Sequence, residues 1–280
     1  MSRSIVLLGG PDSGKTNYIG PLWLALDHGK GALHAAEQPP DIAFVLSVAD
    51  HIFQGSFAPR TELSDIRRNF EVVVAATKDG PRSKVIVPDI SGELWRNAVI
   101  ENEISSDWMD ELKQTDAALL FIRVDSDQDV RPLDWVTARN MLERVGNEED
   151  QGLPTQVMLC ELIHFLEDSL ARREDGGRPR LSVVVAAWDR VDPDKFEQGP
   201  IAYLEREYPL VAGRIEDLTA LDVKVFGLSS IGGDLKNDLE YRDKFLDEGP
   251  NDQGWTAVYD GQKWQKIFDI TIPIEWAVGL

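Results

Sequence analysis

One eight-residue stretch near the start of the chain limits the possible fold more than any other feature. Residues 9–16 read Gly-Gly-Pro-Asp-Ser-Gly-Lys-Thr, which matches the pattern G-x-x-x-x-G-K-[ST]. The short apolar run at residues 4–8 before it predicts a buried strand, and the spacing of Tyr18, Leu22 and Leu26 after it predicts a helix. A glycine-rich turn between a strand and a helix is the setting in which this pattern forms a phosphate-binding loop.

The residues of this loop have separate expected roles. Glycines let the backbone curl so that successive N–H groups point at phosphate oxygens, and the dipole of the following helix adds to the attraction. Lys15 is expected to reach the β- and γ-phosphates, which also makes it a candidate catalytic residue, and the Thr16 hydroxyl is expected to bind Mg²⁺. The predicted nucleotide contacts in the loop are Gly9, Asp12, Ser13, Gly14, Lys15 and Thr16.

The rest of the chain alternates predicted strands with predicted helices. Strands are expected at 70–76 and 84–90, which form a hairpin, and at 117–124, 181–187 and 223–228, the last clear strand. Helices are expected after Gly14, with a kink or early break at Pro21, and at about 95–113, 155–172 and 201–208. This order predicts an α/β fold, a P-loop NTPase with a mainly parallel central sheet of about six strands. One antiparallel hairpin strand belongs to that sheet, and helices flank both faces.

The chain shows no internal repeat, so we expect one main domain. We place it at residues 1–231, with insertions at about 29–60 and 125–152. Residues 232–280 form a C-terminal extension that is polar up to Trp264 and apolar after it. We expect this extension to pack onto the same domain.

Composition excludes several classes of function. The formal net charge of −20 disfavours a nucleic-acid partner and an anionic membrane surface, both of which need a basic surface. The sequence has no apolar run of the roughly 18 residues that a membrane-spanning helix needs. The single cysteine, Cys160, cannot form an internal disulfide, and the four histidines show no metal-ligand spacing. These features predict a cytoplasmic protein without a membrane span.

Further residues that could sense the phosphates lie between the phosphate loop and the predicted strand 117–124. Asp89 ends an apolar strand and opens the sequence Asp-Ile-Ser-Gly, so its carboxylate can hold Mg²⁺ through water while the Gly92 N–H senses the γ-phosphate. Thr61, in the loop before the hairpin, can complete the Mg²⁺ shell when a γ-phosphate is present. The predicted metal ligands are therefore Thr16, Thr61 and Asp89.

Base choice is expected to depend on the ends of two later strands. Asp189 follows the strand 181–187, and a carboxylate there can accept two N–H groups of guanine that adenine does not offer. Ser229 and Ser230 follow the strand 223–228, where a backbone N–H can reach the guanine oxygen. A shifted register would make Asp192 the residue that reads the base, and we rank this alternative second.

In this order and placement, the motifs resemble the translation-factor-related class of GTPases, which includes Ras-like proteins. More narrowly, the chain looks like the bacterial double-GTPase-type domains of conflict and defence gene clusters. The resemblance covers about residues 4–231 and departs from the family in two places. The usual Asn-Lys-x-Asp is Ala186-Ala187-Trp188-Asp189 here, so the lysine that covers the purine is missing, and Trp188 or Arg190 could replace it. Glu93 stands where Ras-like proteins have the glutamine that orients water.

The resemblance implies a Mg²⁺-dependent protein that hydrolyses GTP to GDP and acts as a switch. Glu93 is a candidate for orienting or activating water, and Arg60 for stabilising the transition state in cis. A protein effector or activating partner is expected, and a role in bacterial defence follows only by analogy. Two alternatives remain open: a module that binds GTP without hydrolysing it, and an ATP-dependent enzyme such as a kinase.

Overall fold

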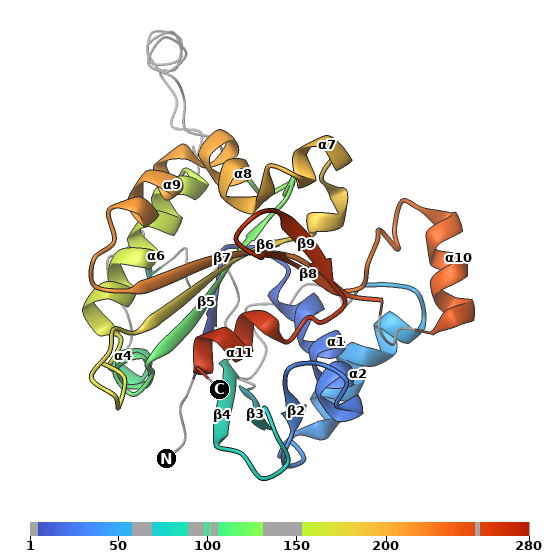
Figure 1. Ribbon diagram of the computed structural model, residues 1–280, viewed down its shortest axis with the longest axis horizontal. Coiled ribbons are helices and arrows are strands. Elements are labelled where there is room, and N and C mark those ends of the chain that lie inside the picture. Colours follow the sequence, from blue (N-terminus) through green and yellow to red (C-terminus); the bar gives the residue numbers. More distant parts are fainter. Residues whose placement is uncertain are drawn as a thin grey trace, which may run out of the picture.

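Figure 1 shows a computed structural model of the chain, which describes residues 5–57, 69–88, 98–99, 101, 106–130, 153–249 and 253–279. The helices and strands follow one another in this order: β1 (Ile5–Leu8), α1 (Lys15–His28), β2 (His34–Ala35), α2 (Ile42–Phe53), β3 (Asn69–Ala75), β4 (Arg82–Pro88), α4 (Ser106–Lys113), β5 (Ala117–Arg123), α6 (Thr155–Ser169), β6 (Arg180–Ala186), the 3-10 turn η1 (Trp188–Arg190), α7 (Pro193–Phe196), α8 (Gly199–Glu207), α9 (Pro209–Glu216), β7 (Asp222–Ser229), α10 (Leu239–Glu248), β8 (Trp255–Tyr259), β9 (Trp264–Ile267) and α11 (Ile272–Val278).

A six-stranded sheet forms the centre of the molecule, with the strand order β1-β5-β6-β7-β8-β9. The first four of these strands run parallel, and β8 and β9 continue the sheet in antiparallel fashion. β1 and β6 are buried nearly throughout, as apolar strands covered on both faces must be. The predicted sheet of about six strands, mainly parallel and flanked by helices, is confirmed.

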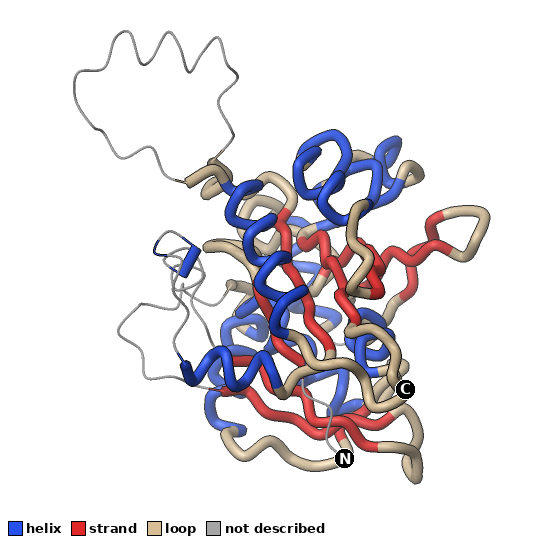
Figure 2. The backbone as a smooth tube through the Cα atoms, turned by 90° about the vertical axis from the view of Figure 1, so that its left-hand side faces the viewer, coloured by secondary structure: helices blue, strands red, loops and turns tan. Residues whose placement is uncertain are grey.

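Two hydrophobic layers cover the sheet, and Figure 2 shows helices on either side of the strands. On one face, alternate residues of β5 and β6 pack with α4, α6, α8 and α9. On the other face, the intervening residues pack with α1, α2 and α11. The alternation follows from the period of two in a strand, which sends neighbouring side chains to opposite faces.

The predicted hairpin is present, but its place differs from the expectation. β3 and β4 pair in antiparallel register, and with β2 they form a separate three-stranded sheet. The antiparallel strands of the central sheet are instead β8 and β9, so the segment 223–228 is not the last strand. Hairpin signals identify which two strands pair with each other, whereas the neighbours of a hairpin depend on tertiary packing.

The C-terminal segment is joined to the core by hydrogen bonds with large sequence separation. The buried Tyr18 hydroxyl donates to the Ile270 carbonyl over 2.8 Å, and the buried Ser182 hydroxyl donates to the Pro273 carbonyl over 2.8 Å. α11 lies against the face that α1 also covers, as Figure 1 shows. Because these groups are buried, their hydrogen bonds hold the C-terminal segment firmly in place.

One local expectation needs correction. α1 runs unbroken through Pro21, which is buried, so the helix does not end early. The expected insertion at about 29–60 contains helix α2, which packs against α1. None of the helices in the described parts of the chain has both the length and the apolar character needed to cross a membrane.

Candidate nucleotide-binding site

The glycine-rich loop joins the carboxyl end of β1 to the first turn of α1. Gly14 is the residue before α1 and has φ of 96°, a left-handed conformation that favours glycine. Gly9 has φ of 149°, and a Cβ atom there would lie 2.6 Å from Ser13 Oγ and 2.7 Å from the Phe121 carbonyl oxygen. Both glycines are therefore required by the backbone path of the loop.

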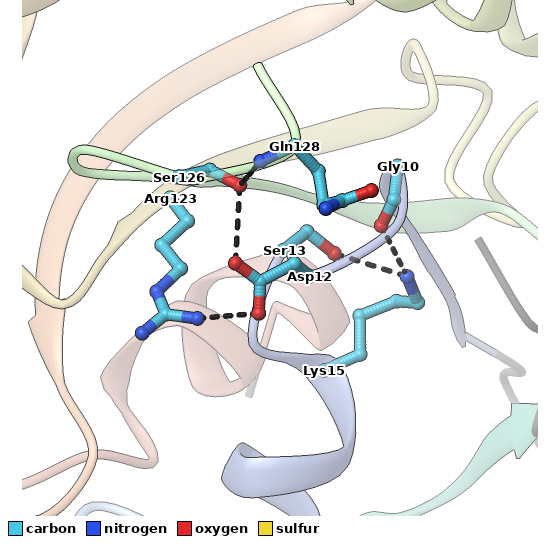
Figure 3. A network of polar contacts seen from close by, with 7 residues as sticks. All are labelled: Gly10, Asp12, Ser13, Lys15, Arg123, Ser126 and Gln128. Atoms are coloured by element: carbon cyan, nitrogen blue, oxygen red, sulfur yellow. Dashed lines mark hydrogen bonds and ion pairs between the residues drawn. The ribbon is translucent and has the colours of Figure 1, made fainter. Parts of the chain in front are cut away.

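The Lys15 ammonium lies over the loop and donates hydrogen bonds to it. Its Nζ is 2.8 Å from the Gly9 carbonyl oxygen. It also lies 3.2 Å from the Gly10 carbonyl oxygen and 3.0 Å from Ser13 Oγ, and Figure 3 shows these two contacts. The positive charge is thus held at the loop, where phosphate oxygens could replace these acceptors.

Asp12, a predicted nucleotide contact, has its side chain engaged elsewhere. Its backbone is left-handed, with φ of 59°, a conformation that aspartate tolerates better than most residues. Arg123 Nη1 lies 2.5 Å from Asp12 Oδ1, and the Ser126 hydroxyl donates to Asp12 Oδ2 over 3.1 Å (Figure 3). The carboxylate is therefore tied to the end of β5 and to the loop that follows it.

A cavity of about 510 Å³ opens beside the loop and joins several predicted site residues. Gly14 of the loop, Asp189 and Ser230 share its wall. The remaining lining residues are Asn17, Phe57, Arg123, Ala186, Ala187, Arg190, Ile231, Gly233 and Asp234. We call this space the base cavity.

Asp189 lies in η1, directly after the end of β6. Ala187 before it has φ of 56° and ψ of 39°, a strained conformation for a residue other than glycine, and such strain concentrates at functional sites. Burial raises the pKa of the Asp189 carboxyl, although a hydrogen bond from the Ser229 hydroxyl acts in the opposite direction. The fully buried Ser229 Oγ also accepts from the Gly232 N–H over 2.9 Å. Ser229 thereby links the two strand ends that border the base cavity.

The structure bears on the alternatives for reading and covering the base. Asp192 is exposed, pairs with Lys195 at 3.4 Å and does not line the base cavity. Trp188 is 1% exposed and packs edge-on against Tyr203, with ring centroids 5.6 Å apart, so it belongs to the core and cannot cover a base. Arg190 lines the base cavity and is exposed.

The packing of Trp188, the residue before Asp189, leads to a test of stability. A Cβ atom on Gly227 of β7 would lie 2.6 Å from the Trp188 ring. We expect Gly227→Ala to destabilise the protein by about 1–3 kcal/mol, because the ring is fully enclosed and overpacking costs this much. Chemical denaturation measures the change.

Gly213→Ala is the matched control for this test, because Gly213 is exposed on α9 and a Cβ atom there meets nothing within 4 Å. The control should leave stability unchanged or raise it slightly, since alanine favours helix. Equal stability of the two variants would show that Trp188 can move.

Five predicted site residues fall outside the described parts of the chain: Arg60, Thr61, Asp89, Gly92 and Glu93. Asp89 follows Pro88, the last residue of β4. Phe57 lines the base cavity three positions before Arg60 in the sequence.

Sequence reasoning did not identify several of the residues around the base cavity, among them Asn17, Phe57, Arg123 and Asp234. One of them carries a usable signal. Arg123 is the only charge in the apolar run 117–124, and it stands at the carboxyl end of a parallel strand. Ligands of open α/β sheets bind outside this end, so a charge in that position indicates a site.

The fold and the site define a nucleotide-binding protein of the P-loop α/β class. The model of the Double-GTPase 1 family matches residues 6–277, so the chain belongs to this family. The expected resemblance to double-GTPase-type domains is confirmed, and the protein is a GTP-binding P-loop protein.

Among solved structures, the signal recognition particle receptor SRb-GTP/SRX complex from Chaetomium thermophilum is similar at a TM-score of 0.39 and 13% identity. The match covers 87% of this chain and 97% of that one. None of the curated proteins compared with the sequence matches it significantly.

Proposed function

We propose that the protein is a Mg²⁺-dependent GTPase that hydrolyses GTP to GDP and switches between two nucleotide states. The observation that carries this proposal is the base cavity, in which Gly14 of the phosphate loop, Asp189 and Ser230 share one wall. In this proposal the loop amides, Lys15 and Thr16 bind the phosphates and metal, and Asp189 reads guanine. The Ser229-Ser230 loop supplies an N–H to the guanine oxygen.

The loop also fits the magnesium ion that the family implies. Thr16 occupies the first turn of α1, next to Lys15, and its hydroxyl is the kind of hard oxygen donor that Mg²⁺ prefers. With Thr61 and Asp89, it would form the protein part of the metal shell. When bound, the ion would neutralise charge on the β- and γ-phosphates.

Hydrolysis is assigned to residues that the sequence alone places near the phosphates. Glu93 would orient the attacking water, and Arg60 and Lys15 would stabilise charge that develops during phosphoryl transfer. Glutamate in place of glutamine favours slow intrinsic turnover, which an activating partner protein would accelerate. The insertions at about 29–60 and 125–152 are the proposed surfaces for such a partner. The proposed compartment is the cytoplasm, and the proposed role is in bacterial defence.

One sequence feature favours a second candidate, a module that binds GTP without hydrolysing it. The glutamine that orients water in Ras-like proteins is replaced by Glu93, whose carboxylate could instead be solvated at a helix start. Single-turnover hydrolysis separates the two functions, because a binding module would keep its GTP intact over hours.

The experiment that tests the proposal is a titration of the purified chain with fluorescent GTP, GDP and ATP analogues, with Mg²⁺ and with EDTA. We expect micromolar or tighter binding of guanine nucleotides, about 10-fold or more weakening with EDTA, and exclusion of ATP. A preference for ATP would overturn the role of Asp189 and favour an ATP-dependent enzyme. Release of phosphate in a single turnover would then establish hydrolysis.

A further inference from the structure

The phosphate loop contains a negative charge that a site for anions should not tolerate. Asp12 lies at the centre of the loop, between Gly10 and Gly14, where phosphate is expected to bind. A carboxylate at this position repels phosphate oxygens, and the partly buried setting screens this repulsion less than water would. The fold must therefore compensate this charge.

Arg123 provides the compensation from a neighbouring strand. Its guanidinium Nη1 lies 2.5 Å from Asp12 Oδ1, and both side chains are largely buried, with 24% and 20% of their surface exposed. Ser126 donates to the other carboxylate oxygen over 3.1 Å, while its own Oγ accepts from the Gln128 N–H over 3.2 Å. Figure 3 shows Asp12 between Arg123 and Ser126, on the opposite side from Lys15.

The topology places Arg123 between the two halves of the nucleotide site. β5 lies between β1, which leads into the loop, and β6, which leads to Asp189. Arg123 is the last residue of β5 and pairs in register with Ala186, the last residue of β6. Arg123 lines the base cavity. It also lines a second cavity of about 600 Å³, together with Gly10 and Ser13 of the phosphate loop.

We propose that Arg123 is a positioning residue for nucleotide binding, which acts by neutralising the Asp12 carboxylate and holding the phosphate loop against the end of β5. The inference rests on the proposed nucleotide site and adds a residue to it. Since Arg123 acts through Asp12, its effect reaches the phosphate chain of any nucleotide, whatever the base.

Charge removal on either side of the pair tests this proposal. We expect Arg123→Met to weaken the binding of GTP and of inorganic tripolyphosphate by about 10-fold or more, because it leaves Asp12 uncompensated. Asp12→Asn should bind both ligands at least as well as the unchanged protein. In the double variant Asp12→Asn/Arg123→Met, the affinity should return to within about 3-fold of the unchanged protein. This non-additivity is the signature of a direct coupling.

Arg172→Met is the matched control, because Arg172 is exposed at the end of the α6 region and should have no effect. Thermal unfolding of each variant shows whether it is folded. Loss of GTP affinity alone, with normal tripolyphosphate binding and no recovery in the double variant, would overturn the proposal in favour of a direct contact between Arg123 and the base. Tight binding of ATP in place of GTP would overturn the guanine assignment and leave the pair intact. Absence of both GTP and tripolyphosphate binding by the unchanged protein would overturn the proposed nucleotide site and the role of Arg123 with it.

Discussion

We expect replacement of Lys15 with methionine to lower the affinity for GTP by about 100-fold or more. The ammonium lies at the phosphate loop, 2.8 Å from the Gly9 carbonyl oxygen and 3.0 Å from Ser13 Oγ, so it is positioned to meet a phosphate chain bound by the loop. Charge-assisted hydrogen bonds are worth about 1.5–3 kcal/mol each, and two of them account for a change of this size. The overall charge of −20 makes the local positive charge more important, since any nucleotide approaches against repulsion.

Fluorescence titration with a GTP analogue measures this change, and Lys244→Met is its control. Lys244 is 63% exposed on α10 and forms a long surface pair with Glu248, at 3.9 Å. We expect the control to bind GTP normally. Thermal unfolding checks the fold, because Lys15 also donates to loop carbonyls in the absence of nucleotide. Equal GTP affinity of Lys15→Met and Lys244→Met would contradict the assignment of the loop as a phosphate site.

The parts of the structure that follow from local sequence were predicted well. The loop 9–16 and its flanking strand and helix depend on contiguous residues, and the base cavity brings Gly14 together with Asp189 and Ser230 as their strand-end positions implied. The carboxyl ends of parallel strands meet at one edge of a sheet, so residues at those ends are close whatever lies between them. This reasoning needs only the strands and their direction.

The features that the sequence did not predict depend on contacts between distant segments. Asp12 and Arg123 are 111 positions apart, and nothing in either neighbourhood indicates an ion pair. β8 and β9 lie in a segment that is rich in polar and charged residues. β9 is an edge strand, and most of its side chains are exposed, so they can be polar. Edge strands lack the continuous apolar pattern that identifies buried ones. Trp188 similarly could face the base or the core, and only the packing against Tyr203 decides this.

Replacing Asp189 with asparagine should exchange guanine preference for xanthine preference. A carboxylate accepts the two N–H groups on the edge of guanine, whereas an amide offers one acceptor and one donor and so matches the edge of xanthine. Loss of a hydrogen bond to a charged group costs about 1.5–3 kcal/mol, so GTP affinity should fall by about 10- to 100-fold. Competition of GTP and XTP against a labelled nucleotide measures the exchange, and Asp192→Asn is the control because Asp192 is exposed outside the base cavity.

The same variant should be more stable than the unchanged protein in the absence of nucleotide at neutral pH. Burial raises the pKa of Asp189 in the folded state above its ordinary value of 3.8, so the folded protein retains this proton more strongly than the unfolded chain. The contribution of Asp189 to the free energy of unfolding is therefore lost as the pH rises through the raised pKa. Asparagine does not ionise, so the variant does not lose stability in this way. Thermal unfolding at acidic and neutral pH measures this effect. The unfolding temperature of Asp189→Asn, relative to that of the unchanged protein, should increase as the pH rises. Normal GTP binding by Asp189→Asn would show that Asp189 does not read the base. If the stability difference between Asp189→Asn and the unchanged protein were the same at acidic and neutral pH, Asp189 would not be a buried carboxylate.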